Sequence, residues 1–416
     1  MQTSDHNSVW ATCPADILLM ILQKLDLKSI INCMDVNTFW RSLVKYYCEK
    51  ANLWKAVVQY SIEDVKFTEK NILGWQDQFL SAQQWLNANN VNVSLQNHNK
   101  LDNINNISVY RDNLIVVTDV AVKYFDIENF KVLKTIERSC LKYEETSTLV
   151  AELSSCDYIT EDYPRTITMN YGLDVLTLTN KIIKESFDSG SVEGNIYVQL
   201  KISLFKVHLN ACYAIDIKNV LWMYTANANG WDFKALAKYY GNRGSICSIH
   251  IHKNNVYVLS KRGDVFLIDM ECKKFEKVFH LHVPLNCLDS ELLFFQPFTL
   301  LINAPNAECR GYVEIYAYKQ KEFVLIISRH GVSCVLEHGH ALLLGYEDGK
   351  IEIYLTKKLT ESSEGPELEI HLQNCLDKTN QLEKSLRINS LDVYEDKAGH
   401  HLFVATHSDV YELLLC

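Results

Sequence analysis

Residues 245–281, SICSIHIHKNNVYVLSKRGDVFLIDMECKKFEKVFHL, contain four short β-rich runs separated by turn residues. The runs cover residues 245–252, 256–260, 265–270 and 275–281. Runs rich in Val, Ile and Phe that are bounded by Asn, Gly and Asp are typical of strands joined by tight turns. The segment therefore predicts a four-stranded antiparallel meander.

Similar units recur from about residue 91 to the end of the chain. When their third strands are aligned, the anchors follow one another at about 40 to 60 residues, which is the period of a β-propeller blade. We count about seven blades, with anchors at Val122–Asp126, Val175–Leu178, Cys212–Asp216, Val265–Asp269, Val313–Tyr316, Ile351–Tyr354 and Val410–Leu413.

Three of these anchors end in Asp, namely Asp126, Asp216 and Asp269. WD repeats carry the Asp of their Trp-Asp pair at this place, although here Phe or Ile replaces the Trp and no unit shows a Gly-His pair at the usual place. The array resembles a degenerate WD-type propeller, and the resemblance implies an all-β, WD-repeat-like ring that needs no cofactor for its stability.

The amino-terminal part has a different periodicity. Between residues 13 and 57, apolar residues recur at helical spacing and predict three short helices, the second over about 27–33 and the third over about 37–50. Pro14 suits a helix start, and Asp26 can cap the second helix. Three helices in about 45 residues bury little apolar surface, so a partner is expected to cover the exposed stripe.

This segment resembles an F-box. The resemblance rests on Cys13–Ile30 (CPADILLMILQKLDLKSI), Val36, Trp40–Leu43 and Leu53–Lys55. The chain departs from the family at Cys13, where Leu is usual, and at Asn37–Phe39. The resemblance implies docking on the Skp-type adaptor of a cullin-RING ubiquitin ligase, and the alternative is a three-helix cap packed on the rest of the chain.

The expected adaptor contacts are the apolar residues that occupy family-matching places. They are Pro14, Ile17, Leu18, Ile21, Leu22, Leu25 and Trp40.

The predicted organisation has three parts: a helical F-box module at 1–57, a helical linker at 58–90 and the propeller at 91–416. The linker carries Ile72, Trp75, Phe79, Ala82 and Leu86 at helical spacing, with Trp85 beside them. Such a helix either fixes the angle between module and propeller or is simply packed under the second domain.

Composition excludes several classes of function. The 416 residues carry 41 basic and 51 acidic side chains, a formal charge of −10, which argues against a surface made for nucleic acid or anionic membrane. We find no signal peptide and no long apolar run. The thirteen cysteines contain no CxxC pair. We expect an intracellular protein of the cytoplasm, with the nucleus as a second compartment.

Motifs for catalysis are absent from the sequence: there is no GxGxxG, P-loop, HExxH or GxSxG. Four histidine pairs invite a metal-site interpretation: His250 with His252, His280 with His282, His338 with His340, and His400 with His401. No Cys or carboxylate at ligand spacing completes any of them. We therefore predict core or solvated histidines, no metal, no cofactor and no enzymatic activity.

The favoured function is that of a non-catalytic substrate receptor whose propeller binds a target protein. An adaptor-independent interaction scaffold is the alternative. Residues 61–416 carry 35 basic and 46 acidic groups, so a phosphorylated or acidic target would need a focused basic spot. Lys261 and Arg262 on a predicted turn, with Arg243, are the candidate substrate-binding residues.

Overall fold

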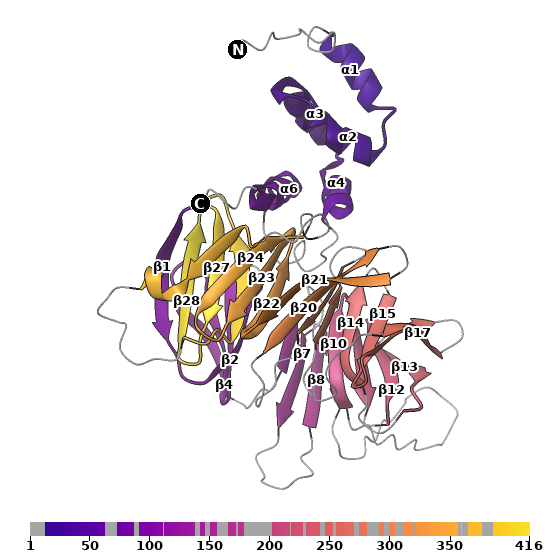
Figure 1. Ribbon diagram of the computed structural model, residues 1–416, viewed down its shortest axis with the longest axis vertical. Helices are drawn as coiled ribbons and strands as arrows, with labels where there is room; N and C mark the ends of the chain where they lie inside the picture. Colours follow the sequence, from indigo (N-terminus) through magenta and orange to yellow (C-terminus); the bar gives the residue numbers. More distant parts are fainter. Residues whose placement is uncertain are drawn as a thin grey trace.

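The computed structural model shows a small group of helices beside a ring of four-stranded sheets (Figure 1). It describes residues 13–62, 73–86, 91–110, 112–137, 142–145, 150–155, 165–171, 174–178, 202–216, 218–227, 230–241, 246–252, 255–269, 274–280, 291–294, 299–303, 311–319, 322–356, 359, 365–376 and 386–416.

The amino-terminal helices are α1 (Ala15–Leu22), α2 (Leu27–Cys33), α3 (Thr38–Lys50) and α4 (Trp54–Ser61). Two side chains start helices as N-caps: Asp26 Oδ1 accepts a hydrogen bond from Ser29 N at 2.8 Å, and Asn37 Oδ1 accepts one from Trp40 N at 2.9 Å. The predicted second and third helices are observed. The expected module end at residue 57 falls inside α4, so the module has a fourth helix.

The linker helix α6 (Trp75–Gln84) contacts α4 and continues the core of the module. Its Phe79 and Ala82 are buried there, and the Phe79 ring lies 5.7 Å from that of Trp54. The rest of this core comes from α1–α4: Leu18, Leu22, Ile30, Met34, Trp40, Leu43, Val44, Cys48, Trp54, Val57, Val58 and Ile62.

The propeller strands pair in chain order into antiparallel sheets. The first three sheets along the chain are β2 (Ile104–Tyr110), β3 (Asn113–Thr118), β4 (Ala121–Asp126), β5 (Val132–Glu137); β6 (Lys142–Glu145), β7 (Val150–Ser155), β8 (Arg165–Tyr171), β9 (Asp174–Leu178); and β10 (Ile202–His208), β11 (Ala211–Asp216), β12 (Val220–Asn227), β13 (Gly230–Lys238).

The next three sheets are β14 (Ile246–His252), β15 (Asn255–Ser260), β16 (Asp264–Asp269), β17 (Lys274–His280); β18 (Glu291–Phe294), β19 (Thr299–Asn303), β20 (Tyr312–Lys319), β21 (Glu322–His330); and β22 (Val332–His338), β23 (Ala341–Tyr346), β24 (Lys350–Leu355), β25 (Leu368–His371). A short helix, α7 (Leu372–Cys375), follows β25.

The last sheet joins the two ends of the propeller. It contains β26 (Ser390–Glu395), β27 (His400–Ala405), β28 (Asp409–Leu415) and, as its fourth strand, β1 (Val93–Lys100). Val93 pairs with Leu415 and Lys100 with Asp409, so a strand from the start of the propeller lies beside the last strand of the chain (Figure 1). This pairing closes the ring by holding strands from both ends of the propeller in one sheet.

The first strands of neighbouring sheets contact one another around the ring: β2 with β26, β26 with β22, β18 with β14, β14 with β10, and β10 with β6. Apolar side chains fill the seams between sheets. Among the described residues, the largest such cluster lies between β22–β25 and the closing sheet and includes Leu343, Ile353, Leu391, Leu402 and Leu413.

The predicted fold class is confirmed: a helical module precedes an all-β propeller. The prediction was about seven blades, and the described strands pair into seven four-stranded sheets. Two aligned anchors were wrong by one strand. Cys212–Asp216 forms the second strand of its sheet and Val175–Leu178 lies in the fourth, because strands in one meander share the same alternation and turn signals.

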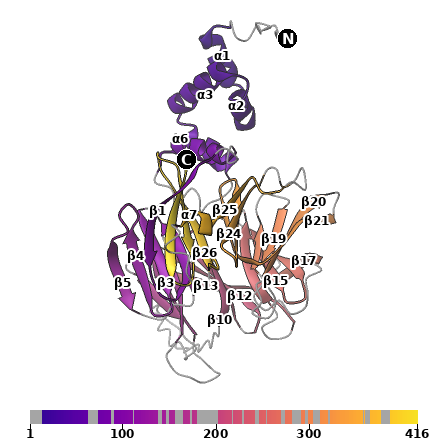
Figure 2. The same ribbon diagram turned by 60° about the vertical axis from the view of Figure 1, so that its left-hand side comes forward.

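Antiparallel order gives the ring two distinct faces. Turns between first and second strands, and between third and fourth, lie at one face; turns between second and third strands lie at the other. The first face also holds the start of β1 and the end of β28 and adjoins α6, and we call it the linker face (Figure 2). The other, the distal face, carries residues 261–263 and 347–349, where Gly263 and Gly349 supply the positive φ that each turn needs.

Candidate functional site

The predicted adaptor-binding residues divide into two groups in the structure. Leu18 and Leu22 are 0% exposed and Trp40 is buried, so these three side chains form the core of the module. Ile21 and Leu25 are half-buried, whereas Pro14 and Ile17 are exposed. The helical periodicity identified the apolar stripe correctly, but a stripe does not say which of its members the module itself covers.

Exposed apolar side chains lie on α1 and around the start of α3. Ile17 is 49% exposed and Met20 66%, and Val36 and Phe39 are also exposed. Large apolar side chains that remain wet in so small a module are typical of a surface that a partner covers. Met20, Val36 and Phe39 were absent from the predicted contacts. For Met20 the signal was available in the sequence, because it lies three residues after Ile17 in the same predicted helix, whereas Val36 precedes α3 and no helical spacing identifies it.

The junction between module and propeller centres on Trp85, which caps the carboxyl end of α6. Its indole Nε1 donates a hydrogen bond to Glu395 Oε1 at 2.9 Å, and its ring stacks on His400 with 4.2 Å between centroids. Trp85 is buried within the same apolar cluster as the closing sheet. One helix therefore contributes Phe79 to the core of the module and Trp85 to that of the propeller.

Glu395 is the charged centre of this junction. His338 Nε2 lies 3.1 Å and His400 Nδ1 3.2 Å from its Oε1 atom, and all three side chains are buried. Burial alone would raise the pKa of Glu395, but the contacts with His338 and His400 outweigh burial and hold that pKa well below its usual range. The prediction of core histidines fits these two positions, but their grouping around one carboxylate was not anticipated.

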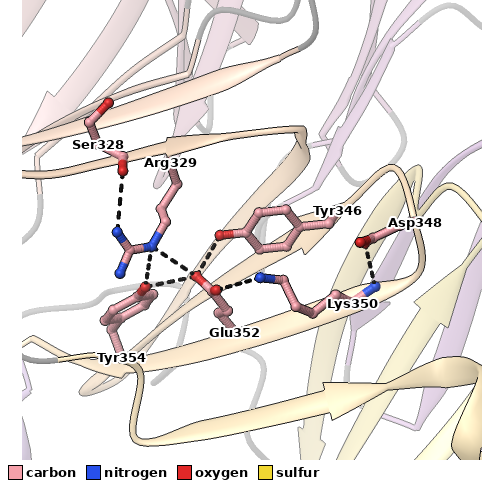
Figure 3. A network of polar contacts seen from close by, with 7 residues as sticks. All are labelled: Ser328, Arg329, Tyr346, Asp348, Lys350, Glu352 and Tyr354. Atoms are coloured by element: carbon pink, nitrogen blue, oxygen red, sulfur yellow. Dashed lines mark hydrogen bonds and ion pairs between the residues drawn. The ribbon is translucent and has the colours of Figure 1, made fainter.

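A second polar network joins two neighbouring sheets near the distal face (Figure 3). Glu352 on β24 accepts hydrogen bonds from Lys350 Nζ at 2.7 Å, Tyr346 Oη at 2.5 Å and Tyr354 Oη at 2.7 Å. Arg329, from β21 of the adjacent sheet, adds its Nε atom at 3.3 Å. The network therefore connects β21 to β23 and β24 through one buried carboxylate.

The contacts within this network set the protonation states of its tyrosines and carboxylate. Burial raises the pKa of Tyr346 and of Tyr354, and the nearby Glu352 carboxylate raises both further. For Glu352, burial acts to raise the pKa, but the hydrogen bonds from Lys350 and the two tyrosines outweigh it and lower the pKa. The tyrosines thus stay protonated donors and the carboxylate stays ionised.

Two of the three predicted substrate-binding residues, Lys261 and Arg262, lie on the distal face, away from α6. Lys261 and Arg262 form the turn between β15 and β16; Arg262 is exposed and Lys261 half-buried. Arg243 falls outside the described residues. Within the described part of the chain, no cluster of three or more His, Cys, Asp or Glu could hold a metal ion, and no helix is long and apolar enough to cross a membrane.

The fold and its exposed helical surface define a class of protein: a small helical module with exposed apolar side chains, joined to a β-propeller. A comparison with family models then assigns the module, because residues 10–51 match the F-box domain. The chain thus carries an F-box domain followed by a propeller.

Other comparisons were less informative. A search of curated proteins found no match. Among similar solved structures, the computationally designed Ika8 protein is 9% identical, with 76% of this chain and 96% of that chain covered and a TM-score of 0.49. A chain from an S. cerevisiae complex of Dbp5 bound to Nup159, Gle1, IP6 and ADP is 10% identical, with 78% and 95% covered and a TM-score of 0.49. We draw nothing further from these two likenesses.

Proposed function

We propose that this protein is a substrate-recognition subunit of an SCF-type cullin-RING ubiquitin ligase. The observation that carries the proposal is the F-box match at residues 10–51, on a module whose α1 and α3 leave apolar side chains exposed. F-box domains generally bind Skp-type adaptors. In this proposal the adaptor covers Ile17, Met20, Val36 and Phe39, and the propeller binds a target protein.

Such a subunit would act without chemistry of its own. It would hold a target close to the ubiquitin-charged enzyme, so that reaction with target lysines gains from high effective concentration. The junction at Trp85 supports this proposal, because a buried anchor between α6 and the propeller limits the orientations that a bound target could adopt. We place the protein in the cytoplasm and nucleus, where such ligases act.

Adaptor binding tests the proposal directly. The double variant Ile17→Asp/Met20→Asp should lose adaptor binding by at least about a hundredfold, because two carboxylates would be desolvated in the contact. Binding is measured by calorimetric titration of the purified full-length protein with a Skp-type adaptor.

Tyr60→Asp is the matched control, since Tyr60 on α4 is also 49% exposed, and it should bind normally. Leu22→Asp is unsuitable as a test, because Leu22 lies in the core of the module and its replacement would unfold the helices. If a folded Ile17→Asp/Met20→Asp protein binds the adaptor like the unaltered chain, or if the unaltered chain does not bind it, the interaction-scaffold alternative replaces the proposal.

A further inference from the structure

Five basic side chains lie at the distal ends of two adjacent sheets, β10–β13 and β14–β17. They come from the β11–β12 turn, the end of β13, the β15–β16 turn and the middle of β17. We call them the basic patch: Lys218, Lys238, Lys261, Arg262 and Lys277. The chain as a whole has a formal charge of −10, so the patch is a locally positive region on a protein that is negative overall.

Two carboxylates at this end of the described strands, Asp216 and Asp264, are already engaged. Asp216 is buried and accepts hydrogen bonds from the backbone of Lys218 and Val220 and from Trp222 Nε1. Asp264 lies 2.5 Å from Lys277 Nζ and 2.9 Å from His280 Nδ1. In the described part of the chain, Lys218, Lys238, Lys261 and Arg262 have no ion-pair partner, so their charge is available to a ligand.

An aromatic side chain accompanies the patch. Tyr240, two residues after the end of β13, is 88% exposed, and Lys238 Nζ lies 5.5 Å from its ring centroid. The preceding Tyr239 is held in place: its backbone N donates to Asn219 O at 2.9 Å, and its ring lies 5.1 Å from that of Phe266 on β16. Tyr239 thereby joins the two sheets and presents Tyr240 beside the cations. Exposed Tyr and Arg side chains are preferred anchors of protein interfaces.

We propose that the basic patch with Tyr240 docks a segment of the target protein that is rich in Asp and Glu. The inference rests on the proposed function and names the chemistry of its target. Three of the four available cations are lysines, which act as separate point charges on flexible stems, and the four are spread over two sheets. This layout suits a row of carboxylates better than one phosphate, which is held best by arginines that converge on it.

A peptide-binding experiment tests the proposal with the full-length protein. The probe is a fluorescent peptide of alternating Glu and Gly with one Trp, and its binding is followed by anisotropy at low and high salt. We expect binding that weakens as salt rises. The double variant Lys238→Glu/Arg262→Glu should weaken it by at least about tenfold, since two attractions become repulsions.

The matched control is Lys234→Glu/Lys274→Glu. Both lysines are exposed and lie on the same two outer strands, β13 and β17, but nearer the linker face. The control has the same net charge as the test variant, so it changes the long-range field without changing the patch. Its affinity for the peptide should therefore stay within about twofold of that of the unaltered protein. Tyr240→Ala should weaken binding by a factor that salt does not change.

Two results would overturn the proposal: equal loss in the test and control variants, or binding of a single-phosphoserine peptide with none of the Glu peptide. Adaptor titration of the same variants separates this inference from the proposed function. Lys238→Glu/Arg262→Glu should bind the adaptor normally, whereas failure of the unaltered chain to bind adaptor would affect the proposed function alone.

Discussion

At the scale of single residues, Glu395 shows how a buried charge can be retained in a propeller. Its carboxylate accepts a hydrogen bond from Trp85 and lies against His338 and His400, so three elements far apart in the sequence meet on one side chain. Removing one partner of such a group lowers the free energy of unfolding by more than its hydrogen bonds contribute. The remaining polar groups stay buried and have lost a partner.

We predict that Glu395→Gln lowers the free energy of unfolding by about 1–3 kcal/mol, because the neutral amide loses the charge that faces His338 and His400 and is a weaker acceptor for the Trp85 indole N–H. Urea denaturation of the purified protein measures this. Glu369→Gln, on the exposed side of β25, should change stability by less than about 0.5 kcal/mol. Similar losses in both variants would contradict a special role for Glu395.

The same residue predicts a pH dependence. The pKa of Glu395 is lowered by folding, so its stabilising contribution is present above the unfolded pKa of about 4.3 and is lost as pH falls toward the folded pKa. The difference in stability between the unaltered protein and Glu395→Gln should therefore stay constant from pH 7 to about pH 5 and shrink below about pH 4.

At the scale of elements, α6 is shared between two cores. Phe79 and Ala82 belong to the core of the helical module, and Trp85 to that of the propeller. The amphipathic pattern predicted this helix. The pattern could not distinguish a rigid connector from a simply packed helix, because that depends on whether the carboxyl end of α6 enters the core of the propeller. The buried indole at the junction favours the rigid connector.

We predict that Trp85→Ala destabilises the protein by about 3–5 kcal/mol, since it leaves a cavity and removes the donor to Glu395. It should also free the module from the propeller. Small-angle scattering at a temperature where the variant is folded should then show a larger radius of gyration than for the unaltered chain. Trp85→Phe retains the ring and should preserve the compact profile, and an unchanged profile for Trp85→Ala would exclude α6 as the coupling element.

At the scale of the whole molecule, the ring depends on β1, which lies more than 300 residues before its partner β28. Leu95 on β1 packs against the apolar cluster of the closing sheet, while the neighbouring Gln96 is exposed. Closing a ring through two distant strands makes the stability of the last sheet dependent on a few side chains of β1.

We predict that Leu95→Asp lowers the melting temperature of the propeller by several degrees, since it places a carboxylate against apolar side chains at a cost of about 1–3 kcal/mol. Gln96→Asp adds the same charge on the solvent side and should leave the melting temperature nearly unchanged. Calorimetry of both variants provides the measurement. Equal melting temperatures would mean that β1 contributes little to ring closure.

Local patterns in the sequence determined the elements and their order. Helical spacing predicted α2 and α3 closely, and alternating apolar runs with turn residues predicted a propeller, because periodicities of about 3.6 and 2 are properties of the local chain. The F-box match at residues 10–51 agrees with the resemblance read from Cys13 to Lys55. Two strand alignments were wrong because consecutive strands of a meander carry the same pattern.

Burial and distant contacts were decided only by the tertiary structure. The apolar residues of α1 include Leu22, which is buried in the module, and Met20, which is exposed to solvent. The difference depends on how α1 packs against α3. The meeting of Trp85 with Glu395 and the pairing of β1 with β28 bring together residues about 300 positions apart. No local periodicity encodes such contacts, because they arise when the ring closes and each sheet finds its neighbour.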